Sequence, residues 1–392
     1  MSVSRVARSE WHPGVVFALF ISFFLLLGLI VGSLGVLWAD IVPALGISLG
    51  VFGTAQLVSP LVSVVVLLFG ASLSAWGGKK RLGLMAIALE GGAVLALAVA
   101  GGLAGLVVGL VIAGAANGLM EISVNGGTLD WERATGRHAM NYMHAGYSGG
   151  AVLGALGAGL LRGWGWGYQQ VLILLAMFAA IVFLATLPTR FPPTLDGREK
   201  SHPADTIKIL FSGRVMMTLA LIAIIGPLAE TVANVYSVIY LRGLGAAVVV
   251  GGLAFALFNA AMFLGRIGNA SLVQRYGARF SLLASAVLLV IANGLLLIPG
   301  GVPLAVVAFM VLGVAVAGVV PTVLSAADQA MPNRSGAVAG AMMAACYTSF
   351  VIWSPVIGWI AELFSLQAAL LTVGVSGLAL FALAWTLKGH VR

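Results

Sequence analysis

Long apolar stretches separated by short polar breaks extend along the whole chain. The charged side chains fall between stretches of about 20 residues, the length that a helix needs to cross a hydrocarbon core of roughly 30 Å. Counting these stretches predicts twelve membrane helices. They are expected at residues 15–38, 48–73, 82–100, 103–128, 138–161, 167–187, 213–240, 247–272, 279–298, 302–325, 336–361 and 366–387. The pattern therefore predicts an all-α integral membrane protein embedded in a lipid bilayer.

The longest polar break divides the expected helices into two sets of six. It runs from Pro188 to Lys208 and is rich in proline and charged residues. We expect an N-terminal six-helix half at 1–187, a cytoplasmic linker at 188–211 and a C-terminal six-helix half at 212–392. The turns 77–81 and 275–279 occupy corresponding places in the two halves, which suggests an internal repeat. Many secondary transporters are built from such repeats, with the solute site near the membrane midplane.

Composition agrees with this pattern, and the charge adds an orientation. The chain is 61% hydrophobic and 8% charged, with 52 glycines and a formal charge of +8. Of the 20 basic residues, 17 fall in alternate loops on one side, whereas Arg162 and Arg242 fall on the other and Arg266 lies within a span. This bias predicts an inner (plasma) membrane protein with both termini cytoplasmic. The basic charge is thus a topology signal, and we expect no nucleic-acid partner.

Enzyme chemistry finds no support in the sequence. The chain has no phosphate-binding Gly-rich loop followed by Lys-Ser/Thr, so nothing indicates an ATP-driven pump. It has no clustered metal ligands, and its one cysteine, Cys346, excludes a disulfide framework. We expect no enzyme activity, no metal and no cofactor. A gradient must then supply the energy for any transport.

An acid between two amides marks the fourth expected helix. Asn117, Glu121 and Asn125 follow one another at four-residue spacing, which places them on one face of a helix. A carboxyl at membrane depth is costly and normally faces a cavity or pathway. It also resists ionisation, so it can load and release a proton. Glu121 is our first candidate for proton coupling; the alternative is a neutral acid that ties the fourth helix to the fifth.

The fifth expected helix carries a matching polar face. Asn141, His144 and Tyr147 recur at three-residue spacing, and His144 lies at a depth similar to that of Glu121. A carboxyl and an imidazole at the same depth would suit a proton relay, although a structural histidine is an equal alternative. Farther along this helix, five glycines predict close helix packing. These are Gly149, Gly150, Gly154, Gly157 and Gly159.

The second half offers a comparable group on the seventh helix. Glu230 and Asn234 stand four residues apart, Tyr236 follows, and Gly226-Pro227 should break the helix and free backbone carbonyls. Glu230 is a second candidate for proton coupling, and the alternative is that it faces water at the outer interface. Asn234 and Tyr236 are candidate binding residues.

Four further side chains are candidates for solute contact: Tyr240, Asn259, Tyr347 and Trp353. Together they would supply an apolar platform with polar handles, and helix packing is the alternative. Two charged residues inside spans receive structural interpretations. Glu90 is expected to extend to the cytoplasmic surface or pair with a basic loop residue. Arg266 is expected to reach the inner headgroups or pair across helices.

The turn between the second and third helices resembles a signature of the major facilitator superfamily. That family carries Gly-x-x-x-Asp-Arg-x-Gly-Arg followed by basic residues, and residues 70–80 match its glycines and basic pair. Ser74 and Ala75 replace the acid and the arginine. The resemblance covers the whole chain and implies a twelve-helix fold with a gating turn. Its gating residues would be Gly70, Gly77, Lys79, Lys80 and Arg81.

A narrower resemblance, to the fucose-permease branch of that family, covers the fourth and fifth helices. The branch has Glu-x-x-x-Asn-Pro and then Asn-Leu-x-Gln-x-x-Asn-Ser-x-Gly-Ala, and residues 121–126 and 141–151 are similar to it. The resemblance implies that Glu121 holds the proton, His144 stands for a glutamine and Tyr147 for a sugar-binding asparagine. Gly126 replaces the proline, and the first helix has no acid before Asp40.

These observations predict a monomeric secondary transporter whose ligands are protons and a small-molecule solute. The leading hypothesis is proton-coupled symport of a small polar solute such as a sugar, by alternating access. The alternative is a proton-coupled exporter of lipophilic or drug-like compounds. A receptor or scaffold that does not transport is the least favoured hypothesis, because it gives no reason for buried acids.

Overall fold

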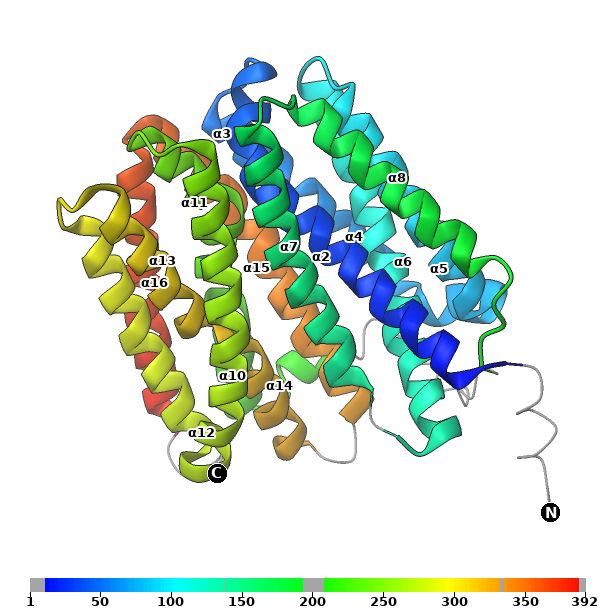
Figure 1. Ribbon diagram of the computed structural model, residues 1–392. Helices are drawn as coiled ribbons and strands as arrows, with labels where there is room; N and C mark the ends of the chain where they lie inside the picture. The colour runs from blue at the N-terminus through cyan, green and yellow to red at the C-terminus, as the bar shows by residue number, and fades with distance from the viewer. Residues whose placement is uncertain (1–10, 138, 193–207, 332–334, 388–392) are drawn as a thin grey trace. The chain divides into compact units, whose positions relative to one another are not determined.

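The computed structural model describes residues 11–137, 139–192, 208–331 and 335–387, which form helices joined by short turns (Figure 1). No β-strand occurs in these ranges. Ten helical stretches within them are long and apolar enough to cross a membrane. The all-α membrane architecture predicted from the pattern is therefore confirmed.

The helices follow the expected spans in chain order. The first half contains α2 (Pro13–Ala44), α3 (Leu49–Gln56), α4 (Val58–Leu68), α5 (Gly70–Ala98), α6 (Leu103–Thr135), α7 (Met140–Gly163) and α8 (Tyr168–Thr186). The second half contains α10 (Arg214–Ile225), α11 (Leu228–Gly243), α12 (Val248–Leu297), α13 (Gly301–Ala317), α14 (Val319–Ala330), α15 (Ser335–Leu363) and α16 (Leu366–Thr386). The 50 residues of α12 cover two expected spans, and α7, which is not among the ten stretches, covers the fifth. Twelve spans are thus accounted for.

The break expected in the seventh span is present. Helix α10 ends at Ile225 and α11 begins at Leu228, so the chain departs from one continuous helix at Gly226-Pro227. Proline causes the break because it lacks an amide hydrogen and its ring collides with the preceding turn. The indole Nε1 of Trp353 donates a 2.9 Å hydrogen bond to the carbonyl of Ile224, beside the break.

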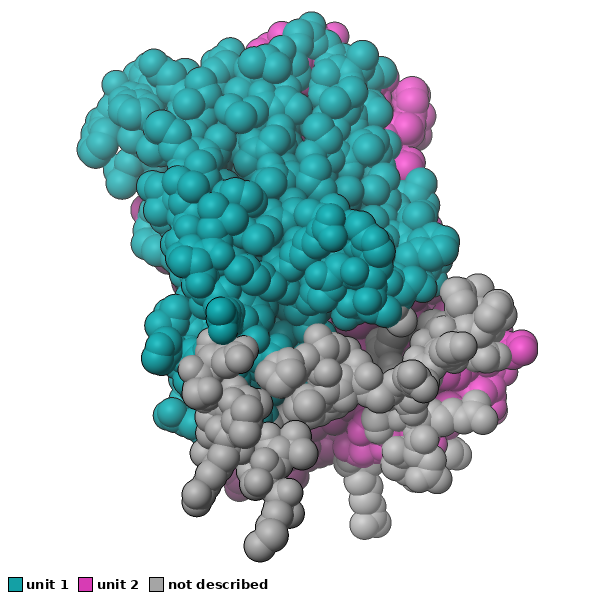
Figure 2. All heavy atoms as spheres, turned by 90° about the vertical axis from the view of Figure 1, so that its right-hand side faces the viewer, with its two compact units in different colours: residues 1–34, 58–200 teal, residues 35–57, 201–392 magenta. Residues whose placement is uncertain are grey.

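The chain forms two compact units, which Figure 2 colours separately. Unit 1 contains residues 1–34 and 58–200, and unit 2 contains residues 35–57 and 201–392. The end of α2 and the whole of α3 therefore group with the C-terminal helices. The domain limits expected from the sequence stay a prediction, and most of the expected linker lies outside the described residues.

The same backbone device occurs in both units. Helix α5 bends at Gly78, with φ 65° and ψ 161°, and α12 bends at Gly277, with φ 83° and ψ 165°. Both φ values lie in the left-handed region, which only glycine enters without strain. The two turns lie where the sequence suggested a repeat. Each of these two segments, expected to be a loop, is therefore helical on both sides of a single glycine.

In unit 1, α2 and α7 approach each other closely and run side by side (Figure 1). A Cβ atom at Gly150 or Gly154 would lie 2.3 Å from the carbonyl oxygen of Leu25 or Leu29. The predicted glycine packing is confirmed at these two positions. It is wrong at Gly149 and Gly157, where a Cβ atom would meet nothing within 4 Å.

In unit 2, α3 packs against α15 through small residues. A Cβ atom at Gly53 would lie 2.5 Å from the carbonyl oxygen of Ser354, and one at Gly358 would lie 2.5 Å from that of Leu49. The Glu362 carboxylate accepts a 2.7 Å hydrogen bond from the amide of Gly50 at the start of α3. A carboxylate is favourable there because the first amides of a helix have no partner within the helix.

Candidate functional site

The acid and amides of α6 form the first part of the candidate site. Asn117, Glu121 and Asn125 are all half-buried in unit 1. The Asn125 side-chain amide nitrogen donates a hydrogen bond to the Glu121 carboxylate, one helical turn away. The side-chain amide oxygen of Asn125, Oδ1, is buried and has no hydrogen-bond partner. This oxygen is an available acceptor beside an ionisable group.

The polar residues predicted on helix α7 differ in how exposed they are. The His144 side chain is exposed, and its ring centroid lies 5.2 Å from that of Phe24 on α2. Tyr147 is half-buried, and its carbonyl oxygen would touch a Cβ atom at Gly28. The Asn141 side chain lies outside the described residues. The proton relay between His144 and Glu121 stays a prediction.

A second acid–amide pair lies in unit 2. Glu230 and Asn234 on α11 are both half-buried and share a side-chain hydrogen bond. Arg266 of α12 attracts the Glu230 carboxylate, and Cys346 of α15 lies close enough to feel the charge on Glu230. Three helices therefore bring ionisable groups together around Glu230. Of the two expectations for Arg266, this arrangement supports an interaction with another helix rather than contact with the inner headgroups.

The remaining expected binding residues of unit 2 have mainly structural contacts. Tyr236 is fully buried and donates a 3.1 Å hydrogen bond to the Ser354 carbonyl. Asn259 is 3% exposed, and its amide donates 2.9 Å to the Phe255 carbonyl of its own helix. Trp353 is held by the bond to Ile224 described above, and Tyr347 is half-buried beside Phe350. Their role in solute binding stays a prediction, and the geometry of Tyr236 and Asn259 supports packing instead.

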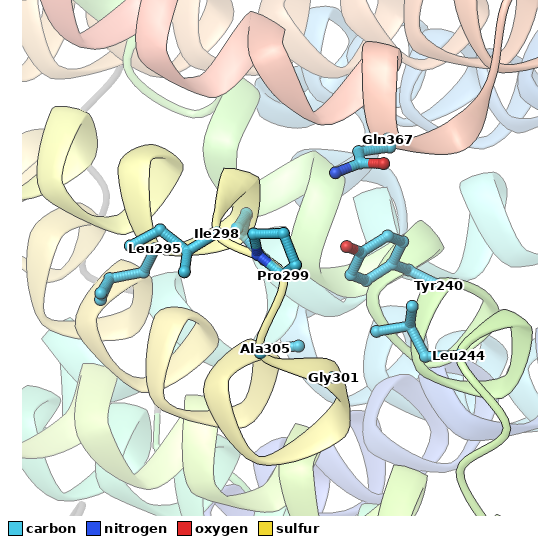
Figure 3. A pocket seen from close by; sticks show the side chains of 10 residues that line it. Tyr240, Leu244, Leu295, Ile298, Pro299, Gly301, Ala305 and Gln367 are labelled. Atoms are coloured by element: carbon cyan, nitrogen blue, oxygen red, sulfur yellow. The ribbon is translucent and has the colours of Figure 1, made fainter.

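A pocket of about 460 Å³ lies elsewhere in unit 2 (Figure 3). It is bordered by the end of α11, the turn between α12 and α13, and the start of α16. Tyr240 and Gln367 point towards the same opening, opposite Pro299. Tyr240 is ten residues from Glu230, about 15 Å along a helix. Of the described residues that the sequence suggested for solute contact, Tyr240 lines this pocket.

The gating residues expected from the family signature lie at the Gly78 bend. The Lys79 ammonium group forms a buried ion pair with Asp130 of α6, and Ser123 donates 2.7 Å to the Lys79 carbonyl. Lys80 donates 2.7 Å to the Leu187 carbonyl, and Arg81 lies 4.4 Å above the Trp76 ring. Gly70 and Gly77 lie in the same segment of α5, before the bend. Their gating role stays a prediction.

Sequence reasoning did not single out Asp130 or Glu362. Asp130 lies near the end of the fourth span, two residues before Glu132, and Lys79 lies 51 residues away along the chain. The only local signal was an acid at a helix end opposite a basic turn. Glu362 lies at the end of α15, and nothing in its neighbourhood pointed to the start of α3.

The structural interpretation of Glu90 was wrong in one respect. We expected this side chain to reach the cytoplasmic surface or a basic residue, but it is 1% exposed and its Oε1 atom has no hydrogen-bond partner. Gly83 and Leu97, two turns before and after it, pack against Ser123 and Gly109 of α6. Glu90 therefore faces the interface between α5 and α6, level with apolar residues.

This placement predicts that Glu90→Met stabilises the protein. An unsatisfied buried polar group costs about 1–3 kcal/mol, and methionine fills a similar volume without that cost. We expect the free energy of unfolding of the purified protein to rise by roughly this amount, measured as a higher melting temperature in detergent. Glu90→Gln, which keeps a buried polar group, serves as the control and should change little. A lower melting temperature for Glu90→Met would contradict the interpretation.

Metal chemistry gains no support from the described ranges, where no three His, Cys, Asp or Glu side chains gather closely enough to hold an ion. What the fold and the site do define is an all-helical membrane protein with ionisable side chains inside its spans, which is the class of secondary transporters. The model of the Major Facilitator Superfamily matches residues 16–355. The chain therefore belongs to this family and is a multi-pass membrane transporter.

Comparisons with individual proteins agree. The uncharacterized transporter y4wD of Sinorhizobium fredii is 27% identical over 377 residues, which cover 93% of this chain and 96% of y4wD. A crystal structure of the nucleoside transporter NupG has a TM-score of 0.81 at 16% identity and covers 95% of this chain and 99% of that one. A crystal structure of the E. coli fucose:proton symporter FucP has a TM-score of 0.61 at 18% identity, with coverage of 94% and 98%. These structural likenesses establish the shared fold.

Proposed function

We propose that this transporter is a proton-coupled symporter of a small polar solute that works by alternating access. The observation that carries the proposal is an acid bonded to an amide one helical turn away, present once in each unit: Glu121 with Asn125, and Glu230 with Asn234. A carboxyl inside a span marks a proton or substrate pathway in transporters. The similarity to FucP, described as a fucose:proton symporter, supports the same assignment.

The chemistry of the α6 pair supports a coupling role for Glu121. When the carboxyl is ionised, it accepts a hydrogen bond from the Asn125 amide nitrogen, as observed. When it is protonated, its hydroxyl needs a hydrogen-bond acceptor. The buried side-chain oxygen of Asn125, Oδ1, which has no partner, can accept that bond. Rotation of one amide would thus serve both protonation states. The same oxygen could instead accept a hydrogen bond from a hydroxyl group of the solute.

Replacement of Glu121 by glutamine tests the coupling. We expect Glu121→Gln proteoliposomes to retain counterflow of the solute but to lose accumulation driven by an inward proton gradient, because glutamine keeps the hydrogen bonds and carries no exchangeable charge. The solute is first chosen by wild-type uptake of radiolabelled fucose, xylose, uridine and the corresponding sugar acids. Uptake is then followed with and without the gradient.

Glu132→Gln is the matched control. Glu132 is also half-buried on α6, where its carboxylate accepts a 2.5 Å hydrogen bond from the Ala139 amide, and we expect its variant to accumulate solute normally. Wild-type accumulation by Glu121→Gln would remove Glu121 from the coupling mechanism. Export of lipophilic dyes in exchange for entering protons, with no uptake of polar solutes, would replace symport by the exporter hypothesis.

A further inference from the structure

Arg266 is a cation inside a membrane span whose donors are almost unused. It lies eleven residues before the bend at Gly277, about 16 Å along α12, which is half the thickness of a hydrocarbon core of roughly 30 Å. Its guanidinium donates one long bond, 3.6 Å, to the sulfur of Met262. A thioether is a weak acceptor, and a guanidinium carries five N–H donors. Such a group at this depth needs an anionic partner.

Arg266 lies on the face of α12 that is directed towards α11. Gly251 is on this face, because a Cβ atom there would lie 2.9 Å from the Val238 side chain of α11. Asn259 and Met262 follow on the same face at helical spacing, and Arg266 comes four turns after Gly251. The arginine is half-buried rather than sealed in the core. It lies close enough to Glu230 to act on the Glu230 carboxylate electrostatically.

Glu230 attracts Arg266 without closing an ion pair. Within the described ranges, no ion pair of 4.0 Å or less joins the Arg266 nitrogens to a carboxylate oxygen. The Glu230 carboxylate is bonded to Asn234 instead and acts on Arg266 from a greater distance. The guanidinium thus keeps its planar fork available for a carboxylate, which it binds through two parallel hydrogen bonds.

Other charged groups near this pair are few. The helices that pack against α12 are α11, α13, α14 and α16. Besides Glu230, α11 carries Tyr236, Tyr240 and Arg242, α14 carries Asp328, and α13 and α16 carry no titratable side chain. Helix α15, which packs against α11, carries Cys346, Tyr347 and Glu362. Of these groups, Glu230 is the acid on which Arg266 acts electrostatically.

We propose that Arg266 binds the carboxylate of an anionic solute, which takes the place of Glu230 as the partner of this arginine. The inference rests on the proposed proton-coupled function and names its substrate class, a small polar solute with one carboxylate. Two ionised carboxylates beside one guanidinium would repel each other, whereas a protonated Glu230 leaves Arg266 to the solute. The proton on Glu230 would then offset the negative charge of the entering monoanion.

The test compares matched acid and neutral ligands on the purified protein. The probes are glucuronate with glucose, galacturonate with galactose, and lactate with glycerol, followed by thermal stabilisation; glucose 6-phosphate separates phosphate from carboxylate chemistry. We expect at least one carboxylate to stabilise the wild type while its neutral partner does not. In Arg266→Gln the affinity for that carboxylate should fall roughly 10- to 100-fold, the worth of one or two charged hydrogen bonds.

Two variants and a pH series make the test specific. Arg266→Lys keeps the charge without the planar fork and should bind with intermediate affinity, whereas Arg242→Gln, a half-buried arginine at the end of α11, should bind as the wild type does. Wild-type affinity for the carboxylate should fall as pH rises, because ionised Glu230 then competes for Arg266. Glu230→Gln should abolish this dependence, and it remains informative if Arg266→Gln does not fold.

Several outcomes would overturn the inference: no carboxylate stabilises the wild type, neutral or phosphorylated probes act equally well, or Arg266→Gln binds the acid normally. Its failure differs from failure of the proposed function. If a neutral solute is accumulated with protons and Glu121→Gln abolishes this, the function stands and the carboxylate site falls. If the acid binds at Arg266 but neither Glu121→Gln nor Glu230→Gln affects accumulation, the site stands and the proposed coupling falls.

Discussion

Replacement of Lys79 by methionine is expected to lower the free energy of unfolding by about 3–5 kcal/mol, because it leaves the Asp130 carboxylate buried without its cation. The side chains of the two residues are 5% and 1% exposed, so water does not replace the lost ammonium group. The Gly78 bend directs Lys79 into unit 1 and towards α6. The pair therefore joins the turn between the second and third spans to the end of the fourth.

Unfolding in denaturing detergent, followed by tryptophan fluorescence, measures this effect. Lys80→Met is the neighbouring control: Lys80 is half-buried and bonds only a backbone carbonyl, so its loss should cost no more than about 1 kcal/mol. The double variant Lys79→Met with Asp130→Leu should recover most of the loss, because two apolar side chains of similar volume remove both charges together. A Lys79→Met protein as stable as the wild type would show that Lys79 and Asp130 do not form a buried pair in the folded protein.

Substitution of Gly154 by leucine is expected to prevent stable folding of unit 1, with a loss of about 4 kcal/mol or more. The first carbon of any side chain at this position would lie 2.3 Å from the Leu29 carbonyl oxygen. Because that obstacle is backbone, neither helix can move a side chain aside, and α2 and α7 would have to separate. In lipid, close packing of small residues is a main source of helix association, so separation also removes attraction.

Gly157→Leu is the matched control on the same helix. A Cβ atom there would meet nothing within 4 Å, so leucine should be accommodated with little loss of stability. Expression in membranes and the proportion of monodisperse protein after detergent extraction distinguish the two variants. Equal yields from both would mean that α2 and α7 do not touch at Gly154.

Local rules accounted for much of what the sequence predicted. Four-residue spacing predicts that Glu121 and Asn125 share a helix face, and the break between α10 and α11 follows from Pro227. Even the doubled α12 was expected as two spans with a turn at 275–279. Each of these predictions needed only the covalent neighbourhood of the residue.

Predictions failed where they required the rotation of a helix within the bundle. Glu90 was expected at the cytoplasmic surface and lies instead in the interface between α5 and α6, and Asp130 was overlooked as the partner of Lys79. A helix in lipid is apolar on every side, so the pattern of apolar residues does not tell which face is buried. For the same reason, Gly150 and Gly154 could not be told apart from Gly149 and Gly157 as packing residues.

The order of amino acids determines the class of fold and predicts the number of spans and the polar side chains at membrane depth, because all three depend on lengths and compositions that a bilayer imposes along the chain. Tertiary packing decides which of those side chains form hydrogen bonds with other helices. It ties Tyr236 and Trp353 to backbone carbonyls of other helices, whereas Asn259 and Arg266 bond to residues one turn earlier in their own helix. Partners that lie more than 50 residues apart, such as Lys79 and Asp130, meet only after the helices have packed.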